Sequence, residues 1–273
     1  MSLELDNRRR AMLREMGLRV WSPQSAAVAP PTLRSAPAAG KAVAAMPPAP
    51  TWKKEPVVTT QRLVDASPRS WSELHAAVLQ CQRCKQGAGR RAPVFAPAEP
   101  GTVDWLVLGE PPDDTEERHG QAVTGQAGLL LDNMLKAVGV ARTGVDGVSV
   151  LAKGGQRRAY VSNVVKCRPA VMRNPDAHDL ASCESYLRRE VALLQPKVIL
   201  ALGRFAAQSL LQGDLPDVAS IPLGKLRGQV YHYQGIAVVV SYHPSYLLRT
   251  PLDKGRAWLD LCLAAQQMER SQR

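Results

Sequence analysis

The chain has 273 residues, of which 45% are hydrophobic, and its 35 Lys and Arg against 24 Asp and Glu give a formal charge of +11. This length and apolar content suffice for one large domain with a buried core. The basic balance favours an acidic partner, either nucleic acid or a membrane surface. No apolar run reaches the ~18 residues of a membrane span. The arginine-interrupted start is unlike a signal peptide, so we expect a cytoplasmic protein whose cysteines are thiols or metal ligands.

The N-terminal part differs in composition from the rest of the chain. Residues 1–22 carry apolar side chains at roughly helical spacing and end with Trp21 before a proline. In residues 23–50, 17 of 28 positions are Ala or Pro, which cannot build a core. The sequence therefore predicts a partner-binding peptide at 1–22, a disordered Ala/Pro-rich linker at 23–70 and a folded domain at 71–273.

The folded part alternates buried-strand patterns with amphipathic helices. Ser70 followed by Glu73 is a capping-box pattern that predicts a helix start. Alternating strands and helices predict a parallel sheet covered on both faces. Residues 110–125 read as a long polar loop, and residues 142–157 as an exposed insertion. Helices are predicted at 71–79, 125–138, 176–194, 204–211 and 253–268, and strands at 104–109, within 158–165, and at 197–202 and 236–241.

Four of the five cysteines form two spaced pairs. Cys81 and Cys84 are separated by two residues, and Cys167 and Cys183 by fifteen. Four thiolates from two pairs bind either zinc or a four-iron cluster. A zinc ribbon uses two tight pairs, so the wide second pair favours the cluster; four ordinary buried cysteines are the alternative. Cys262 falls on the apolar side of the last predicted helix, where core packing is expected.

Polar side chains follow three predicted strands, where ligand sites of open α/β sheets lie. Asn163 comes at the end of the strand that leads to Cys167. The acidic loop 109–117 offers a carboxylate to orient water, or is simply a solvated loop. The loop 241–249 combines His243 with apolar residues and an arginine, which suits a wedge entering a duplex or a turn folded onto the core.

Five features in order carry a resemblance to a known family. They are Cys81-x2-Cys84, Gly109-Glu110-x-Pro112, Gly120 to Leu131, Asn163-Val-Val-Lys-Cys167-Arg-Pro with Cys183, and His243-Pro-x-Tyr-Leu-Leu-Arg249. Residues 71–273 thereby resemble the family 4 uracil-DNA glycosylases, the iron–sulfur members of their superfamily. The resemblance implies a three-layer α/β/α sandwich around a four-stranded parallel sheet. It also implies a monomeric, monofunctional hydrolase that excises uracil from DNA and leaves an abasic site.

The resemblance also implies roles for single residues. Glu110 and His243 would be catalytic, His243 donating to uracil O2 as negative charge develops there. The extruded base would meet Asn163, whose amide donates to O4 and accepts from N3–H, the opposite of cytosine's pattern. Val123 takes the place of the family's base-stacking phenylalanine. A structural 4Fe-4S cluster is implied on Cys81, Cys84, Cys167 and Cys183, and DNA contacts are implied for Tyr246, Leu247, Arg249, Lys166 and Arg168.

Departures from the family pattern leave a second function open. Pro111 and Asp113 replace a small residue and a glycine of the Gly-Glu loop, and Val123 is not aromatic. The alternative is a weakened glycosylase fold that only binds DNA, or a glycosylase with a shifted base preference. A zinc-binding adaptor is disfavoured by the wide second cysteine pair.

The N-terminal peptide carries a resemblance of its own. Residues 10–21 are similar to the N-terminal peptide of the psi subunit of the bacterial replicative clamp loader. That resemblance implies docking on the loader. A solvated basic helix and a DNA-binding tail are the alternatives.

Overall fold

The computed structural model describes residues 70–98, 103–143, 156–168 and 174–271. The chain divides into two units, residues 1–60 and 61–273, and every described residue belongs to the second. The predicted peptide at 1–22, the predicted linker up to residue 69 and most of the predicted insertion lie outside the described residues. No described helix combines the length and apolarity needed to cross a bilayer.

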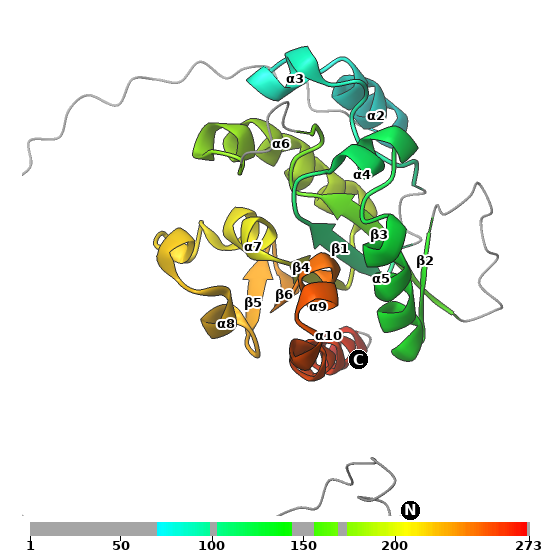
Figure 1. The fold of residues 1–273 in the computed structure, drawn as a ribbon, viewed down its shortest axis with the longest axis vertical. Helices are drawn as coiled ribbons and strands as arrows, with labels where there is room; N and C mark the ends of the chain where they lie inside the picture. Colours follow the sequence, from blue (N-terminus) through cyan, green and yellow to red (C-terminus); the bar gives the residue numbers. More distant parts are fainter. Residues whose placement is uncertain (1–69, 99–102, 144–155, 169–173, 272–273) are drawn as a thin grey trace, which may run out of the picture. The chain divides into compact units, whose positions relative to one another are not determined.

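Six strands form one sheet, in the order β2-β3-β1-β4-β6-β5 (Figure 1). All neighbours are parallel except β5, which runs antiparallel to β6. The predicted four-stranded parallel sheet is its centre, β3-β1-β4-β6, and the sequence patterns do not predict the two short edge strands. β5 reaches β6 through Gln234 and Gly235, both at positive φ, as a two-residue hairpin turn requires. The strands are β1 Trp105–Gly109, β2 Val140–Arg142, β3 Arg157–Asn163, β4 Val198–Leu202, β5 Val230–Tyr233 and β6 Ile236–Ser241.

The five predicted helices are confirmed as α2, α5, α6, α7 and α10. The Ser70–Glu73 capping box is present at the start of α2. The prediction of a polar loop at 110–125 is wrong in one respect, because this segment contains a short helix, α4, capped by Asp113. The helices are α2 Trp71–Leu79, α3 Lys85–Gly89, α4 Asp114–His119, α5 Gly125–Ala137, α6 Ala177–Leu194, α7 Arg204–Leu211, α8 Leu223–Leu226, α9 Pro244–Arg249 and α10 Lys254–Arg270, with 3₁₀ turns η1 Val218–Ser220 and η2 Pro251–Asp253.

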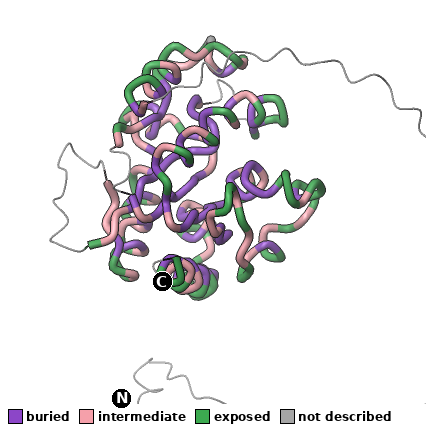
Figure 2. The backbone as a smooth tube through the Cα atoms, turned by 180° about the vertical axis from the view of Figure 1, so that it is seen from behind, coloured by how far each residue is buried: buried purple, intermediate pink, exposed green. Residues whose placement is uncertain are grey.

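The two faces of the sheet bury alternate residues of each strand against different helices. Leu106 and Leu108 of β1 join one core cluster with residues of α2, α6 and α7. Trp105 and Val107 join a second cluster with residues of α5 and α10. Figure 2 shows the buried residues following the sheet and the inner sides of the helices. Because side chains alternate across a strand, this arrangement gives the predicted three layers.

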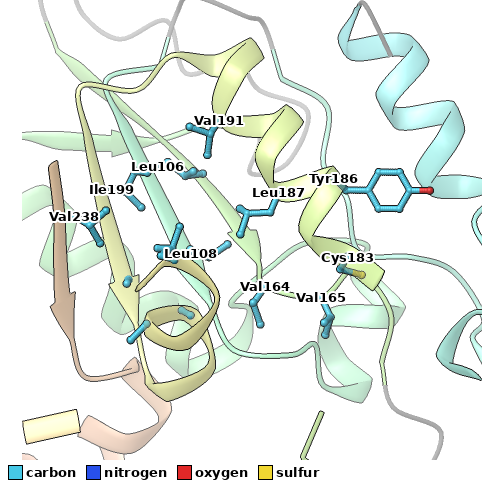
Figure 3. Packing of buried hydrophobic residues seen from close by; sticks show 14 of the residues in the cluster. Leu106, Leu108, Val164, Val165, Cys183, Tyr186, Leu187, Val191, Ile199 and Val238 are labelled. Carbon is cyan, nitrogen blue, oxygen red and sulfur yellow. The ribbon is translucent and has the colours of Figure 1, made fainter. Parts of the chain in front are cut away.

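Helix α6 connects the first cluster to the carboxyl ends of the strands. In Figure 3, Leu187 and Val191 of this helix point toward the sheet, and Cys183, one turn earlier, lies near Val165. Val165 follows β3 and is buried. One face of a single helix therefore packs the core and also carries a cysteine to the segment that follows β3.

The carboxyl ends of neighbouring strands lie in register. Gly109, the last residue of β1, pairs with Asn163, the last residue of β3. Leu202 of β4 likewise pairs with Ser241 of β6. The loops that the sequence singled out therefore start from one edge of the sheet, where ligand sites of open α/β sheets are found.

A buried ion pair lies beneath this edge. The ammonium of Lys166 contacts Glu190 Oε2 at 2.5 Å, Ser162 Oγ at 2.8 Å and the carbonyl oxygen of Asn163 at 2.8 Å. Glu190 Oε1 accepts from Ser162 Oγ at 2.8 Å. Lys166 is 1% exposed, so its predicted DNA contact is wrong: its charge is used inside the protein.

We expect removal of only one member of the Lys166–Glu190 pair to destabilise the protein strongly. Glu190→Leu leaves a buried ammonium without its carboxylate and should lower the free energy of unfolding by about 3–5 kcal/mol. The double variant Lys166→Met/Glu190→Leu should lose less than Glu190→Leu alone, because no buried charge remains. Urea unfolding is the measurement.

Glu184→Leu on the same helix is the matched control. Glu184 pairs with Arg188 at the surface, and exposed pairs contribute at most about 1 kcal/mol. A double variant less stable than Glu190→Leu would contradict the role assigned to the pair.

Candidate active site

Asn163 presents a free hydrogen-bond acceptor at the end of β3. Asn163 is 1% exposed. Nδ2 donates to the carbonyl oxygen of Glu110 at 2.8 Å, and the side chain also hydrogen-bonds to the carboxyl of Glu116. Because a carbonyl only accepts, the amide must turn its nitrogen toward Glu110. Among the described residues Oδ1 has no partner although it is buried, which is costly unless a ligand supplies a donor.

His243 presents a donor nearby. It follows β6 and forms the N-cap of α9, where its Nδ1 accepts from the backbone N–H of Ser245 at 3.3 Å and lies 2.6 Å from Ser245 Oγ. With Nδ1 accepting, the proton of the neutral ring is on Nε2. Burial, and then the charge of Arg249, lower the pKa of His243 to about 4. At neutral pH the ring is therefore an uncharged Nε2–H donor.

Val123, Gly109 and His243 meet at one point. A Cβ placed on Gly109 would lie 3.2 Å from Val123 Cγ2 and 3.6 Å from His243 Nε2. Gly109 thus has its neighbours close on both sides, and a larger residue would displace one of them. Val123 is 1% exposed. The structure places the predicted base-stacking position next to the predicted catalytic histidine.

Glu110 caps a helix and borders two clefts. Its Oε1 accepts from the backbone N–H of Phe205 at 3.1 Å, and the carboxylate also accepts from the N–H of Arg204, both at the start of α7. Gly203 has φ 100°, which other residues rarely adopt, and a Cβ there would displace the Glu110 carboxylate, since it would lie 1.9 Å from Oε1. Burial raises the pKa of Glu110 to about 7 despite these bonds. The carboxyl is therefore poised to gain or lose a proton near neutrality.

The two clefts meet at Glu110. One of about 450 Å³ is lined by residues of the α7 start, α8 and α9, including Arg204, His243 and Arg249. The other, of about 480 Å³, is lined by residues of the acidic loop together with Arg168. The Arg168 guanidinium is held by Glu117 at 2.9 Å, so it forms part of the cleft wall.

Glu116 is a site residue that the sequence analysis missed. It is 5% exposed, and its carboxylate accepts from the backbone N–H groups of Val123 and, at 2.8 Å, of Asp113, besides its bond to Asn163. Burial raises its pKa to about 7. The spacing Asp113-x-x-Glu116 is a capping-box pattern and was the available signal. The capping box also gives a role to Asp113, which replaces a glycine of the family pattern. Asp113 is the N-cap of α4, and its Oδ1 accepts from the backbone N–H groups of Thr115 and Glu116 at 2.8 Å.

The structure corrects the prediction that the loop 241–249 is a wedge entering DNA, because this segment contains helix α9. Leu247 is 1% exposed and packs with Tyr242 and Ala257, so its predicted DNA contact is wrong. Leu248 is 41% exposed instead. A six-residue helix turns adjacent residues to different sides, which the sequence reading of a loop did not anticipate. Arg249 is exposed, and the Tyr246 hydroxyl donates to Asp253 at 2.7 Å.

The four paired cysteines line one small cavity. Cys81 and Cys84 come from the α2–α3 connection, Cys167 from the segment after β3 and Cys183 from α6. Burial raises the pKa of Cys183 to about 12 and also raises the pKa of Cys167, so without a cation these two thiols would stay protonated. A cavity walled by four thiols fits a metal centre better than it fits ordinary core packing.

The spacing of the thiols bears on the zinc alternative. A tetrahedral zinc site with Zn–S bonds of 2.3 Å needs sulfur atoms about 3.8 Å apart. Among the described residues, the one group of three or more such ligands within 4.8 Å of one another is Asp176, His178 and Asp179, not the cysteines. No three of the described cysteine sulfur atoms therefore lie as close together as a closed tetrahedral zinc site requires. Cys262, on α10, is partly buried and does not line it.

Comparisons with known proteins identify the family of the chain. The sequence profile of the uracil DNA glycosylase superfamily matches residues 97–265. The type-4 uracil-DNA glycosylase of Pyrobaculum aerophilum is 30% identical over 195 residues, 70% of this chain and 91% of the relative. That of Archaeoglobus fulgidus is 33% identical over 153 residues (55% and 69%), and that of Sulfurisphaera tokodaii 28% over 185 residues (67% and 77%).

The matched region includes the strand ends that hold Glu110, Asn163 and His243, and the similarity spans most of the relatives' length. The chain therefore belongs to the uracil DNA glycosylase superfamily and, within it, to the type-4 family.

Proposed function

We propose that the protein flips uracil out of DNA and hydrolyses its N-glycosidic bond, leaving an abasic site. The observation that carries this proposal is the buried Oδ1 of Asn163, an acceptor that has no partner among the described residues. Uracil offers N3–H as a donor, whereas cytosine has an acceptor at N3, so this one atom distinguishes the two bases. The sequence predicts that the Asn163 amide donates to uracil O4 and accepts from N3–H. Nδ2 already donates to Glu110 and Glu116, so the better supported of these two contacts is acceptance from N3–H.

His243 would stabilise the leaving base. As the glycosidic bond breaks, negative charge grows on the uracil ring, notably at O2. A neutral Nε2–H donor fixed by Ser245 and enclosed near Val123 and Gly109 suits that charge without a proton transfer.

Glu110 would orient the attacking water. The carboxylate accepts from two N–H groups at the start of α7, and its remaining lone pairs would accept from a water at the meeting point of the clefts. No lysine lines either cleft among the described residues, which favours attack by water over attack by an amine and supports a monofunctional enzyme.

The exposed end of α9 would contact DNA. Leu248 replaces Leu247 as the apolar residue that enters the duplex, and Arg249 beside it would contact the phosphate backbone. Tyr246 stands behind them, held by Asp253. Arg168 at the other cleft is part-exposed and would face the same backbone.

The four-thiol cavity would hold a 4Fe-4S cluster. Bound there, the cluster would act structurally, tying the α2–α3 connection, the segment after β3 and α6 together. Arg90 donates from Nη1 to Cys167 Sγ at 2.8 Å and from Nη2 to the carbonyl oxygens of Val78 and Leu79, so it joins a ligand to the end of α2.

A glycosylase with shifted base preference is the second candidate. Its support is Val123, a buried aliphatic residue at the predicted stacking position beside His243. Valine offers no π-surface, and base stacking on an aromatic contributes about 1–3 kcal/mol. Excision assays on uracil, hypoxanthine and xanthine distinguish the two candidates.

The partner of residues 1–22 is proposed from sequence similarity alone. Docking of this peptide on the clamp loader would tether the enzyme near newly replicated DNA and raise its local concentration there. A monomeric state and a cytoplasmic location likewise stay predictions of the sequence.

Asn163→Ala should reduce uracil excision by about 5- to 150-fold, since one lost hydrogen bond to a buried base edge costs roughly 1–3 kcal/mol. The measurement is single-turnover cleavage of a uracil-containing oligonucleotide after alkali treatment. Asn133→Ala, on the exposed side of α5, is the matched control and should keep the wild-type rate. Wild-type activity in Asn163→Ala would leave Asn163 as a strand-end cap only.

The excision rate should rise with pH through a midpoint near 7. Glu110 has a pKa of about 7, and only its ionised form accepts from the attacking water. His243, with a pKa of about 4, is neutral above pH 5, so it should add no second transition to the pH–rate profile in that range. In Glu110→Gln the midpoint should vanish along with most of the rate. An unchanged midpoint in that variant would assign the ionisation to another group, such as Glu116.

Anaerobically purified protein should contain about four irons per chain and absorb broadly in the visible range. Cys167→Ala should lose iron and stability together, because a ligand and an anchor of the Asn163 segment disappear at once. Cys262→Ala should retain full iron content, since Cys262 does not line the cavity. Stoichiometric zinc without iron would contradict the cluster.

A further inference from the structure

Val123 has an unusual backbone conformation for its residue type. Its φ is 51°, in the left-handed region. For a β-branched residue this region is a genuine outlier, because the Cβ substituents crowd the backbone. Such strain persists only where the surroundings over-determine it, and it concentrates at functional sites.

Two oppositely charged side chains hold this residue from its two ends. The N–H of Val123 donates to Glu116 Oε1, and its carbonyl oxygen accepts from Arg142 Nη1 at 2.8 Å. Arg142 Nη2 also donates to the carbonyl oxygen of Ala122. The guanidinium thus bridges two successive carbonyls, which suits its fork of donors and which a lysine cannot reproduce.

We call Glu116 and Arg142 the Val123 clamp. The residues around it accommodate the Arg142 side chain and the Val123 carbonyl. The Arg142 side chain is 8% exposed and is balanced by Asp132 at 3.6 Å. A Cβ on Gly128 would lie 2.5 Å from the carbonyl oxygen of Val123, so only glycine lets α5 approach it. Arg142 comes from the edge strand β2, and Glu116 from the short helix α4, neither of which the sequence patterns predict.

The clamp acts on both surfaces that would meet the base. Through Val123 it sets the position of the side chain beside Gly109 and His243. Through Glu116 it also reaches the Asn163 amide. A single carboxylate thereby links the edge-reading group to the wall of the site.

We propose that Glu116 and Arg142 are positioning residues that hold Val123 in its strained conformation and so fix the distance between the base-site wall and the Asn163 amide. The inference rests on the proposed uracil excision for its kinetic consequence. Its structural content, a held backbone at Val123, is independent of the base excised.

The kinetic test is a double-mutant cycle on a uracil oligonucleotide. Arg142→Gln should lower the single-turnover excision rate at least tenfold and change DNA affinity by less than threefold. Glycine adopts positive φ without strain, so Val123→Gly needs no clamp. Adding Arg142→Gln to Val123→Gly should therefore slow excision by less than a further threefold. If the tenfold loss recurs in the glycine background, Arg142 acts independently of Val123 and the proposal fails.

Arg157→Gln is the matched control. Arg157 lies on β3 opposite Val140 of β2, and its guanidinium reaches Glu269 at the surface rather than the Val123 loop. It should keep the wild-type rate. Arg142→Lys retains the charge with one compact donor group and should fall between wild type and Arg142→Gln; it carries the same cycle if Arg142→Gln does not fold.

Hydrogen exchange provides a readout that does not depend on uracil. The amide of Val123 should exchange at least tenfold faster in Arg142→Gln than in wild type or Arg157→Gln, because the backbone is released. Unchanged exchange overturns the clamp even if excision is confirmed. Faster exchange in a protein that excises no uracil supports the clamp and overturns the proposed function.

Discussion

The hydrogen bond from Asn163 Nδ2 to the carbonyl oxygen of Glu110 joins the ends of β3 and β1, and the rest of the site depends on it. Gly109 and Asn163 are register partners, so the amide crosses directly to the loop of the neighbouring strand. The bond leaves the buried Oδ1 without a partner among the described residues and fixes where the Glu110 side chain begins. A slip of one residue in the register would send Asn163 to the other face of the sheet.

The short segment from Ser162 to Cys167 combines three environments. Ser162 and Lys166 face the buried carboxylate of Glu190, Asn163 binds the Glu110 carbonyl and the Glu116 carboxyl, and Cys167 faces the thiol cavity. Lys166 shows why a basic residue in a DNA-repair motif need not touch DNA. A buried ammonium bound to carboxylate, hydroxyl and carbonyl oxygens anchors the segment from below, and the anchor holds the Asn163 carbonyl itself.

Much of the fold was predictable because its signals are local. The capping box at Ser70 and the apolar runs of β1, β4 and β6 require only neighbours in sequence, and the helices and strands follow them closely. The sequence also indicated that Glu110, Asn163 and His243 follow strand ends, since parallel strands end together. The misses are strands β2 and β5 and helices α3, α4, α8 and α9, which are short and take their stability from packing. Arg142 was missed for the same reason, because its role exists only where β2 lies beside the Val123 loop.

The sequence by itself determined the α/β class, the positions of the longer elements, the spacing of the cysteines and the family. The tertiary structure decided that four thiols line one cavity, that Leu248 and not Leu247 is exposed, and that Glu116 reaches Val123 and Asn163. It also decided the protonation of the site, lowering the pKa of His243 and raising those of Glu110 and Glu116. The physical reason is the same in each case. Burial and hydrogen-bond partners come from residues distant in the chain, and residue type alone does not specify them.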